Sequence, residues 1–189
     1  MSSKEVRMMG RGGQGTVIAA EMLAAALAED GKWVSAFPSF GVERRGAPVD
    51  AFLRFGDEPI TKVSLITKAD CLVVLDRKRA NSVPESPDLK PGGVMVLNLR
   101  RCPEKAYEGI GTLGQIDATA VATEEIGRDI SNTVMMGAFA RCTGWVRLEA
   151  IGKILENYFH GKVLEMNIRC LKRGYEEIRV INYGGAPNP

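Results

Sequence analysis

The chain has 189 residues, a length that suits one domain, and its 45% hydrophobic and 25% charged residues are ordinary for a soluble globular protein. A formal net charge of +2 and an aromatic content of 6% argue against binding to nucleic acid or to an anionic membrane. The longest apolar stretches are too short to span a bilayer and no signal peptide is recognisable, so we expect a cytoplasmic protein.

Predicted strands and helices alternate along the first part of the chain. Residues 5–9 indicate a strand, which runs through a glycine-rich turn into an alanine-rich helix over 16–29 that stops at Gly31. Residues 32–37 predict a second strand. Residues 48–55 alternate with period two, which is typical of a strand with one face more polar than the other.

The second part of the chain holds two continuous apolar runs and then several helices. Residues 71–76 and 92–98 predict parallel strands that are buried on both faces. A short strand is expected at 114–117. The patterns that follow predict helices over 118–127, 131–144, 147–159 and 162–180.

This alternation predicts a single three-layer α/β/α domain over residues 1–181, with a mostly parallel sheet. The sheet is mixed if the strand at 48–55, which is close in sequence to its neighbour, runs antiparallel. Residues 182–189 are rich in turn formers and predict an irregular tail.

The four cysteines are scattered singly, at Cys71, Cys102, Cys142 and Cys170, and no CxxC pair is present. The sole histidine, His160, does not complete a metal-ligand pattern with them. We therefore expect reduced thiols, no metal site and no iron–sulfur cluster in this chain.

Gly10, Gly12 and Gly15 satisfy G-x-G-x-x-G between a strand and a helix. Such a turn allows a ligand to approach the backbone closely, and free N–H groups at the helix start attract phosphate or carboxylate. A dinucleotide site also expects an acidic residue at the end of the second strand, but Asp30 comes before that strand. The pattern thus favours a turn that packs a helix on a sheet, with or without an anion or partner group.

Three polar residues near predicted helix starts have alternative roles. Gln14 either binds a ligand or partner backbone, or ties down its own loop. Asn132 is expected to cap its helix, with a ligand role as the alternative. Asp76 ends a buried strand, where open sheets place binding residues, but a cap on the next helix is favoured.

Two segments, GRGGQGTVIAAEMLA and FPSFGVERRGAPVDAFLRFGDEPI, closely resemble the gamma subunit of 2-oxoacid:ferredoxin oxidoreductases, the pyruvate enzyme above all. The resemblance continues through ADCLVVLD, PGGVMVLN, NTVMMGAFARCTGWVRLEAI and NIRCLKRGYE, and it is weakest at about residues 100–116. It therefore covers most of the chain.

The resemblance implies oxidative decarboxylation of a 2-oxoacid with coenzyme A (CoA), giving acyl-CoA, carbon dioxide and reduced ferredoxin. Thiamine diphosphate, magnesium and iron–sulfur clusters would belong to alpha, beta and delta-type partner subunits. This chain would assemble the complex, reach ferredoxin only through it, and carry no catalytic residue. A docking surface left exposed without its partner would favour self-association of the isolated chain, for instance as a homodimer.

The resemblance also assigns two groups of residues. The turn would lie on the CoA side of the complex, where its helix start suits a phosphate, although a protein contact would use the same groups. These residues are Gly10, Gly12, Gly13, Gln14, Gly15 and Asn132.

The second group would dock a neighbouring subunit, with arginine forks for carboxylates or phosphates and an aromatic anchor. It comprises Phe40, Gly41, Glu43, Arg44, Arg45 and Gly46. The alternative for this segment is a solvated hairpin with a surface ion pair.

Three alternative functions stay open. A branched-chain, aryl or 2-oxoglutarate oxidoreductase would use a similar subunit, because the oxoacid pocket would lie mostly on other subunits. A stand-alone NAD(P)-dependent dehydrogenase is the alternative from another class. A pure scaffold subunit without a ligand is the third.

Overall fold

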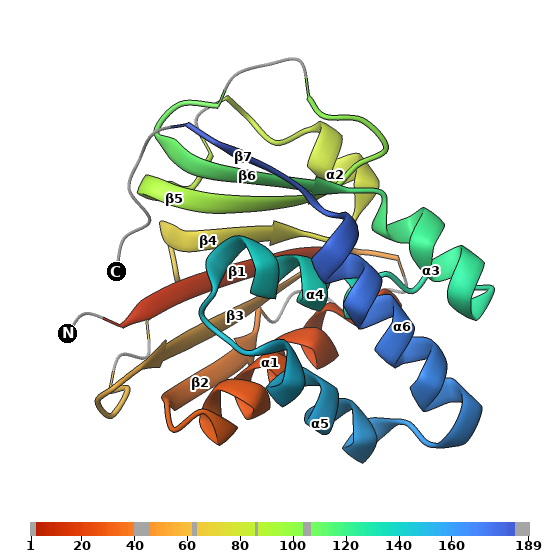
Figure 1. Cartoon of the computed structure of the whole chain (residues 1–189). Helices are drawn as coiled ribbons and strands as arrows, with labels where there is room; N and C mark the ends of the chain where they lie inside the picture. Colours follow the sequence, from red (N-terminus) through yellow and green to blue (C-terminus); the bar gives the residue numbers. More distant parts are fainter. Residues whose placement is uncertain (1–2, 40–45, 62–63, 86, 104–106, 184–189) are drawn as a thin grey trace.

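The protein is described from a computed structural model, which covers residues 3–39, 46–61, 64–85, 87–103 and 107–183. These residues form a seven-stranded sheet in the order β2-β3-β1-β4-β5-β6-β7. In Figure 1 the strands follow this order from β2 at the bottom to β7 at the top. The strands are β1 (Lys4–Arg11), β2 (Trp33–Pro38), β3 (Pro48–Gly56), β4 (Ala69–Val74), β5 (Leu89–Asn98), β6 (Ile110–Ile116) and β7 (Arg179–Asn182).

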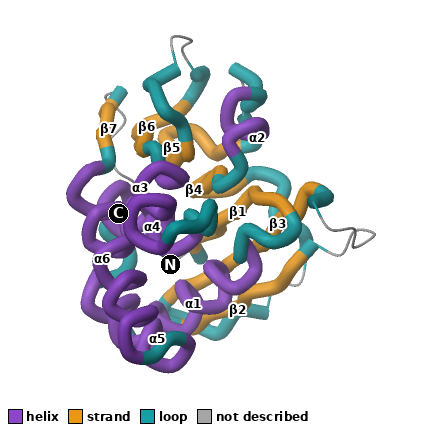
Figure 2. Tube along the Cα trace, turned by 90° about the vertical axis from the view of Figure 1, so that its right-hand side faces the viewer, coloured by secondary structure: helices purple, strands orange, loops and turns teal. Residues whose placement is uncertain are grey.

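The helices are distributed unevenly over the two faces of the sheet. One face carries α1 (Thr16–Glu29), α3 (Ala118–Ile126), α4 (Asn132–Thr143), α5 (Leu148–Tyr158) and α6 (Gly161–Glu177). The short α2 (Arg77–Asn81) packs through Ala80 against the other face, and Figure 2 shows it across β4 and β5 from α3 and α4. The predicted α/β fold is confirmed, although only α2 and connecting segments cover the second face among the described residues.

The sheet is mixed. Strands β1, β4, β5 and β6 pair in parallel, whereas β3 runs antiparallel to both β1 and β2, and β7 runs antiparallel to β6. The antiparallel direction considered for residues 48–55 is therefore confirmed. Because β3 lies between β1 and β2, the second strand of a dinucleotide-binding unit is not adjacent to the first, which argues against that site.

Two local expectations are corrected. The last helix ends at Glu177 rather than at residue 180, and Arg179–Asn182 forms β7 on the open edge of β6, where Ile181 pairs with Leu113. An unpaired strand edge offers backbone partners that a helical pattern does not reveal. Strand β7 includes Asn182, which was predicted to be the first residue of the irregular tail.

The more polar face of β3 carries a buried charge. Arg54 is fully buried, and its Nε donates to Glu5 Oε1 at 2.9 Å on the neighbouring β1. A buried charge is stable only when it is paired and hydrogen-bonded, and this register places Glu5 opposite Arg54. The period-two pattern found the strand but not the burial of its charged side chain.

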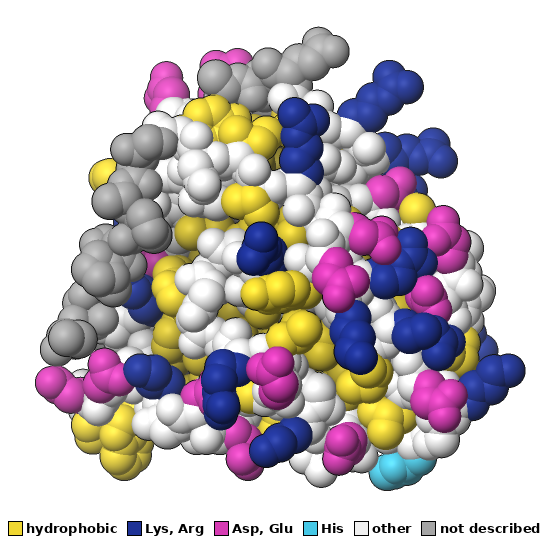
Figure 3. All heavy atoms as spheres, in the orientation of Figure 1, with side chains coloured by type: hydrophobic (Ala, Val, Ile, Leu, Met, Phe, Trp, Pro, Cys, Tyr) yellow, Lys and Arg dark blue, Asp and Glu magenta, His cyan; other side chains and the backbone are white. Residues whose placement is uncertain are grey.

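The surface of the helical face carries mixed charge. Figure 3 shows basic and acidic side chains interspersed over α3 and α6. Arg169 and Arg173 pair there with Glu125, at 2.7 and 3.1 Å. Within the described ranges, no helix is both long and apolar enough to cross a membrane.

Helices α4 and α6 cross in backbone contact at two glycines. A Cβ added to Gly137 would lie 2.0 Å from the carbonyl oxygen of Leu171, and one added to Gly174 would lie 2.0 Å from that of Val134. No side-chain rotation relieves a clash with backbone, so this crossing requires glycine on both helices. The crossing holds α6 against the start of α4, where the cavity described below is formed.

We expect Gly137→Ala to destabilise the protein by about 1–3 kcal/mol, because the new methyl group forces α4 and α6 apart. Gly152→Ala in α5 is the matched control, since its Cβ would meet only Ile168 Cδ1, at 3.7 Å. The control should be neutral or up to about 1 kcal/mol more stable through helix propensity. Urea denaturation of both variants measures the difference, and equal stabilities would contradict the proposed close crossing.

Candidate functional site

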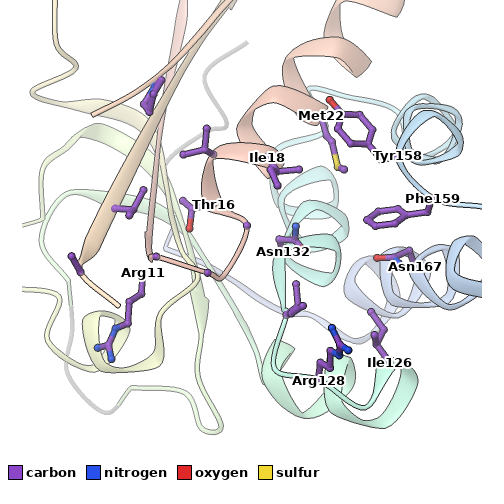
Figure 4. A pocket seen from close by; sticks show the side chains of 18 of the residues that line it. Arg11, Thr16, Ile18, Met22, Ile126, Arg128, Asn132, Tyr158, Phe159 and Asn167 are labelled. Atoms are coloured by element: carbon purple, nitrogen blue, oxygen red, sulfur yellow. The ribbon is translucent and has the colours of Figure 1, made fainter. Parts of the chain in front are cut away.

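A cavity of about 1040 Å³ lies where the β1–α1 turn meets the start of α4 and the α5–α6 connection. Figure 4 shows Arg11 on one side of the turn, with Thr16 and Asn132 facing the space between the turn and α4. Ile18, Met22, Tyr158 and Phe159 form a wall beyond them. This size is at the upper end of the range of small-molecule sites.

The glycines of the turn are required for different reasons. Gly13 and Gly15 have φ values of +96° and +72°, which side-chain-bearing residues rarely adopt. Gly15 also packs on Asn132, whose Nδ2 would be 2.5 Å from an added Cβ. Gly10 sits beneath Thr16, whose Oγ1 would be 1.9 Å from an added Cβ. The turn therefore brings the backbone close to both the first residue of α1 and the start of α4.

Side chains behind the turn hold it in place. Gln14 Oε1 accepts from the Arg11 backbone N–H at 2.9 Å, so this amide ties down its own loop. Arg79, from α2, donates to the carbonyl of Gly10 at 3.1 Å and to Asp50 Oδ1 at 2.6 Å. Asp76 is the N-cap of α2 through Arg79 N–H, as predicted, and its Oδ2 lies 3.3 Å from Arg11 Nε.

Two buried hydroxyl groups at helix starts have no hydrogen-bond partner within the described residues. Thr16, the first residue of α1, lines the cavity and is 2% exposed, and Ser131, the N-cap of α4, is 0% exposed. A buried hydroxyl without a partner is costly, and one beside a cavity is suited to a ligand. The sequence analysis missed Thr16, although its place directly after the last glycine was the available signal.

Asn132 is not the N-cap that we expected, because it is already the first residue of α4. Its Oδ1 accepts from the Thr133 backbone N–H at 2.9 Å, while Ser131 occupies the N-cap position. Thr133 Oγ1 in turn donates to Asn167 Oδ1 of α6 at 2.8 Å. Asn132 thus remains beside the cavity with its side chain fixed by the helix start.

The cavity is positively charged at one end and apolar at the other. Its described lining includes Arg128 and Arg11, the latter paired with Asp76 from outside the lining, and no acidic residue. Ile18 and Tyr158, on the opposite wall, are 45% and 46% exposed, so the apolar wall extends to the surface. Such a cavity suits a long molecule with an anionic part and an apolar part.

The structure brings most of the predicted turn residues to this cavity. Gly12, Gly13, Gly15 and Asn132 line it. Gly10 and Gln14 are not in the lining, and they support the turn from behind through the contacts given above.

Most of the predicted docking residues lie outside the part of the chain that the structure describes. Phe40, Gly41, Glu43, Arg44 and Arg45 lie outside the described residues. Gly46 is exposed with a φ of +86°, and the flanking Ser39 and Ala47 line the cavity.

The thiols of the helical face are poor nucleophiles. Burial raises the pKa of Cys142 to about 12 and that of Cys170 to about 11, and it raises the pKa of Cys71 well above its usual value. These groups are therefore protonated near neutral pH. Within the described ranges, no group of three or more His, Cys, Asp or Glu side chains is arranged to hold a metal ion.

The fold and the site define a class: a mixed-sheet α/β protein with a ligand cavity at converging helix starts. The sequence matches the family described as pyruvate ferredoxin/flavodoxin oxidoreductase over residues 5–177. The chain belongs to this family.

Relatives agree with this membership over nearly their whole length. Pyruvate synthase subunit PorC of Methanothermobacter thermautotrophicus is 47% identical, over 92% of this chain and 95% of that protein. The pyruvate/ketoisovalerate oxidoreductases common subunit gamma of Thermococcus kodakarensis is 41% identical, over 92% and 96%. The crystal structure of pyruvate oxidoreductase subunit PORC from Thermotoga maritima superposes with a TM-score of 0.79 at 39% identity, covering 95% of this chain and 99% of that one.

Proposed function

We propose that this chain is the gamma subunit of a 2-oxoacid:ferredoxin oxidoreductase, with pyruvate as the oxoacid. The complex would convert the 2-oxoacid and CoA to acyl-CoA and carbon dioxide, with the electrons passing to ferredoxin. Family membership over residues 5–177 and the names of the PorC and gamma-subunit relatives support this proposal. The poorly nucleophilic thiols agree with a subunit whose reaction centre lies on its partners.

The role of this chain is to form one wall of the CoA site. The observation that carries this assignment is the unpartnered Thr16 hydroxyl at the start of α1, in a cavity with two arginines and no acid in its described lining. A phosphate of CoA at the turn would accept from Thr16 and from free backbone N–H groups. The apolar wall, with Ile18, Met22 and Tyr158, suits the long pantetheine arm.

The remaining cofactors belong to the partner subunits in this proposal. Thiamine diphosphate and magnesium would stabilise the carbanion, and iron–sulfur clusters would carry electrons, on alpha, beta and delta-type subunits. The name of the Thermococcus relative, a gamma subunit common to pyruvate and ketoisovalerate oxidoreductases, favours substrate choice outside the gamma subunit of that enzyme. A branched-chain, aryl or 2-oxoglutarate enzyme would therefore use the same CoA wall.

The segment 39–48 is proposed to dock a partner subunit at the mouth of the same cavity. Its described flanks, Ser39 and Ala47, line the cavity, and the lining also includes the exposed apolar side chains of Ile18 and Tyr158. Arg44 and Arg45 supply two bidentate donors between these flanks. A partner seated here would complete the CoA site from the open side.

We expect Gly13→Leu to raise the KM for CoA of the assembled complex at least about tenfold, because its side chain occupies the path of a ligand to the turn. Gly31→Leu is the matched control: its φ is +79° and its Cβ would likewise meet nothing within 4 Å, but it lies outside the cavity. Both variants carry similar backbone strain. Equal CoA kinetics in the two variants would instead support a scaffold subunit.

We expect Thr16→Val to weaken CoA binding by the assembled complex about tenfold, without loss of stability. The valine removes a donor to a charged phosphate, yet Thr16 Oγ1 has no described partner to lose. Thr143→Val is the control, because its hydroxyl donates to the Phe139 carbonyl at 2.8 Å and only stability should fall. Calorimetric titration and thermal denaturation separate the two effects, and a less stable Thr16→Val variant with unchanged CoA affinity would assign the hydroxyl to folding.

We expect the double variant Arg44→Ala/Arg45→Ala to lose co-purification with the alpha and beta-type subunits, because both bidentate donors of the docking segment are removed. Lys153→Ala/Lys172→Ala, which removes two exposed positive charges outside both cavities, provides the control for loss of charge. Quantified subunit ratios after affinity purification give the measurement. A complex of normal composition and activity with the first variant rejects docking through these arginines.

A further inference from the structure

A second cavity, of about 710 Å³, opens beside α2 and shares no lining residue with the first. It lies where parallel strands β4, β5 and β6 end, which is where open α/β sheets commonly bind ligands. Its described lining consists of Arg77, Ala80, Asn81, Leu99, Arg100, Arg101, Cys102, Pro103, Tyr107 and Asp117.

The strand ends bring three guanidinium groups and one carboxylate to this cavity. Arg77 follows β4, Arg100 and Arg101 follow β5, and Asp117 follows β6. Asp117 pairs with Arg77, and its Oδ2 also lies 3.6 Å from Arg100 Nε. Asp117 is in addition the N-cap of α3, accepting from the Ala120 N–H at 3.0 Å. A single carboxylate therefore serves two arginines and a helix cap.

Positive charge remains unbalanced in the lining. Arg101 makes no ion pair within the part of the chain that the structure describes. Arg77 Nε is buried and has no hydrogen-bond partner among those residues. Burial, and then the nearby charge of Arg100, lowers the pKa of Arg77, and the charge of Asp129 opposes this shift only in part. An anion in the cavity would accept from the buried Nε and offset the repulsion between the arginines.

The cavity also offers apolar contact beside the arginines. Leu99 is 5% exposed and Ala80 is 1% exposed, and both lie in the lining. Tyr107, also 5% exposed, adds an aromatic side chain. The volume exceeds what a free phosphate ion fills and is within the range of sites for small organic molecules. The chemistry therefore fits an anion attached to a compact organic group.

We propose that this second cavity binds a phosphate monoester, with the phosphate held by Arg77, Arg100 and Arg101 and the organic group against Leu99 and Tyr107. Arginine forks match phosphate oxygens bidentately. Three arginines and one carboxylate in the lining leave an excess of positive charge that favours a doubly charged ligand. The proposal does not depend on the CoA site, because the two cavities have separate linings.

The test is a titration of the ¹⁵N-labelled full chain with inorganic phosphate and, separately, with adenosine 5′-monophosphate, at constant ionic strength. We expect saturable shifts of the backbone amides at residues 77–81 and 99–102, which surround the cavity. The monoester should bind more tightly than inorganic phosphate, because only the monoester contacts the apolar lining. Tighter or equal binding of inorganic phosphate would overturn the monoester assignment.

Arg101→Gln should weaken monoester binding about tenfold, which corresponds to about 1.4 kcal/mol. Lys78→Gln is the matched control, since it removes one positive charge from α2 at a residue outside the lining. Equal weakening of monoester binding by both variants would show that the effect comes from net charge alone, and it would overturn the proposal. Shifts confined to residues 10–16, or no saturable shifts, would also overturn it, and unchanged spectra of the free variants verify their fold.

Discussion

The arrangement of the site depends on how Arg79 of α2, and Asp76 at the N-cap of that helix, hold the end of β1. Arg79 bonds the Gly10 carbonyl and Asp50 of β3, while Asp76 caps α2 and lies beside Arg11. These contacts join three strand ends and a helix by charge-assisted hydrogen bonds, which are stronger than neutral ones. The chain passes from β1 into α1 through glycines in the left-handed conformation, and the first residue of α1 lines the cavity.

A second constraint brings the opposite wall into place. The glycine crossing of α4 and α6 lets their backbones touch, and the Thr133–Asn167 hydrogen bond joins the same two helices near the start of α4. The starts of α1 and α4 therefore meet through the contact of Gly15 with Asn132. Two helix starts, each with a buried hydroxyl that lacks a described partner, create local positive potential in a chain of nearly balanced charge. This local geometry, rather than net charge, is what suits the cavity to an anion.

The separation of the two cavities follows from the uneven helix layers. Both lie at the carboxyl ends of parallel strands, but α1 and α4 enclose one on the helical face, and α2 borders the other. Helix α2 thus has two roles: Arg79 supports the glycine turn, and Arg77 lines the second cavity. A substitution in α2 can therefore affect both the glycine turn and the second cavity through direct contacts.

The sequence by itself determined most element types and the α/β class, because hydrophobic periodicity, glycine and helix propensity act over a few neighbouring residues. The family followed from the resemblance of its motif segments, which the match over residues 5–177 confirms. It also predicted that the glycine turn and Asn132 matter, and both line the first cavity in part. It did not reveal β7, the burial of Arg54, or the unpartnered Thr16 hydroxyl. Strand β7 depends on which strand edge is open, the burial of Arg54 on which charge lies opposite in register, and the Thr16 hydroxyl on which helix starts face each other. These are contacts between residues far apart in the chain, and only the tertiary structure decides them.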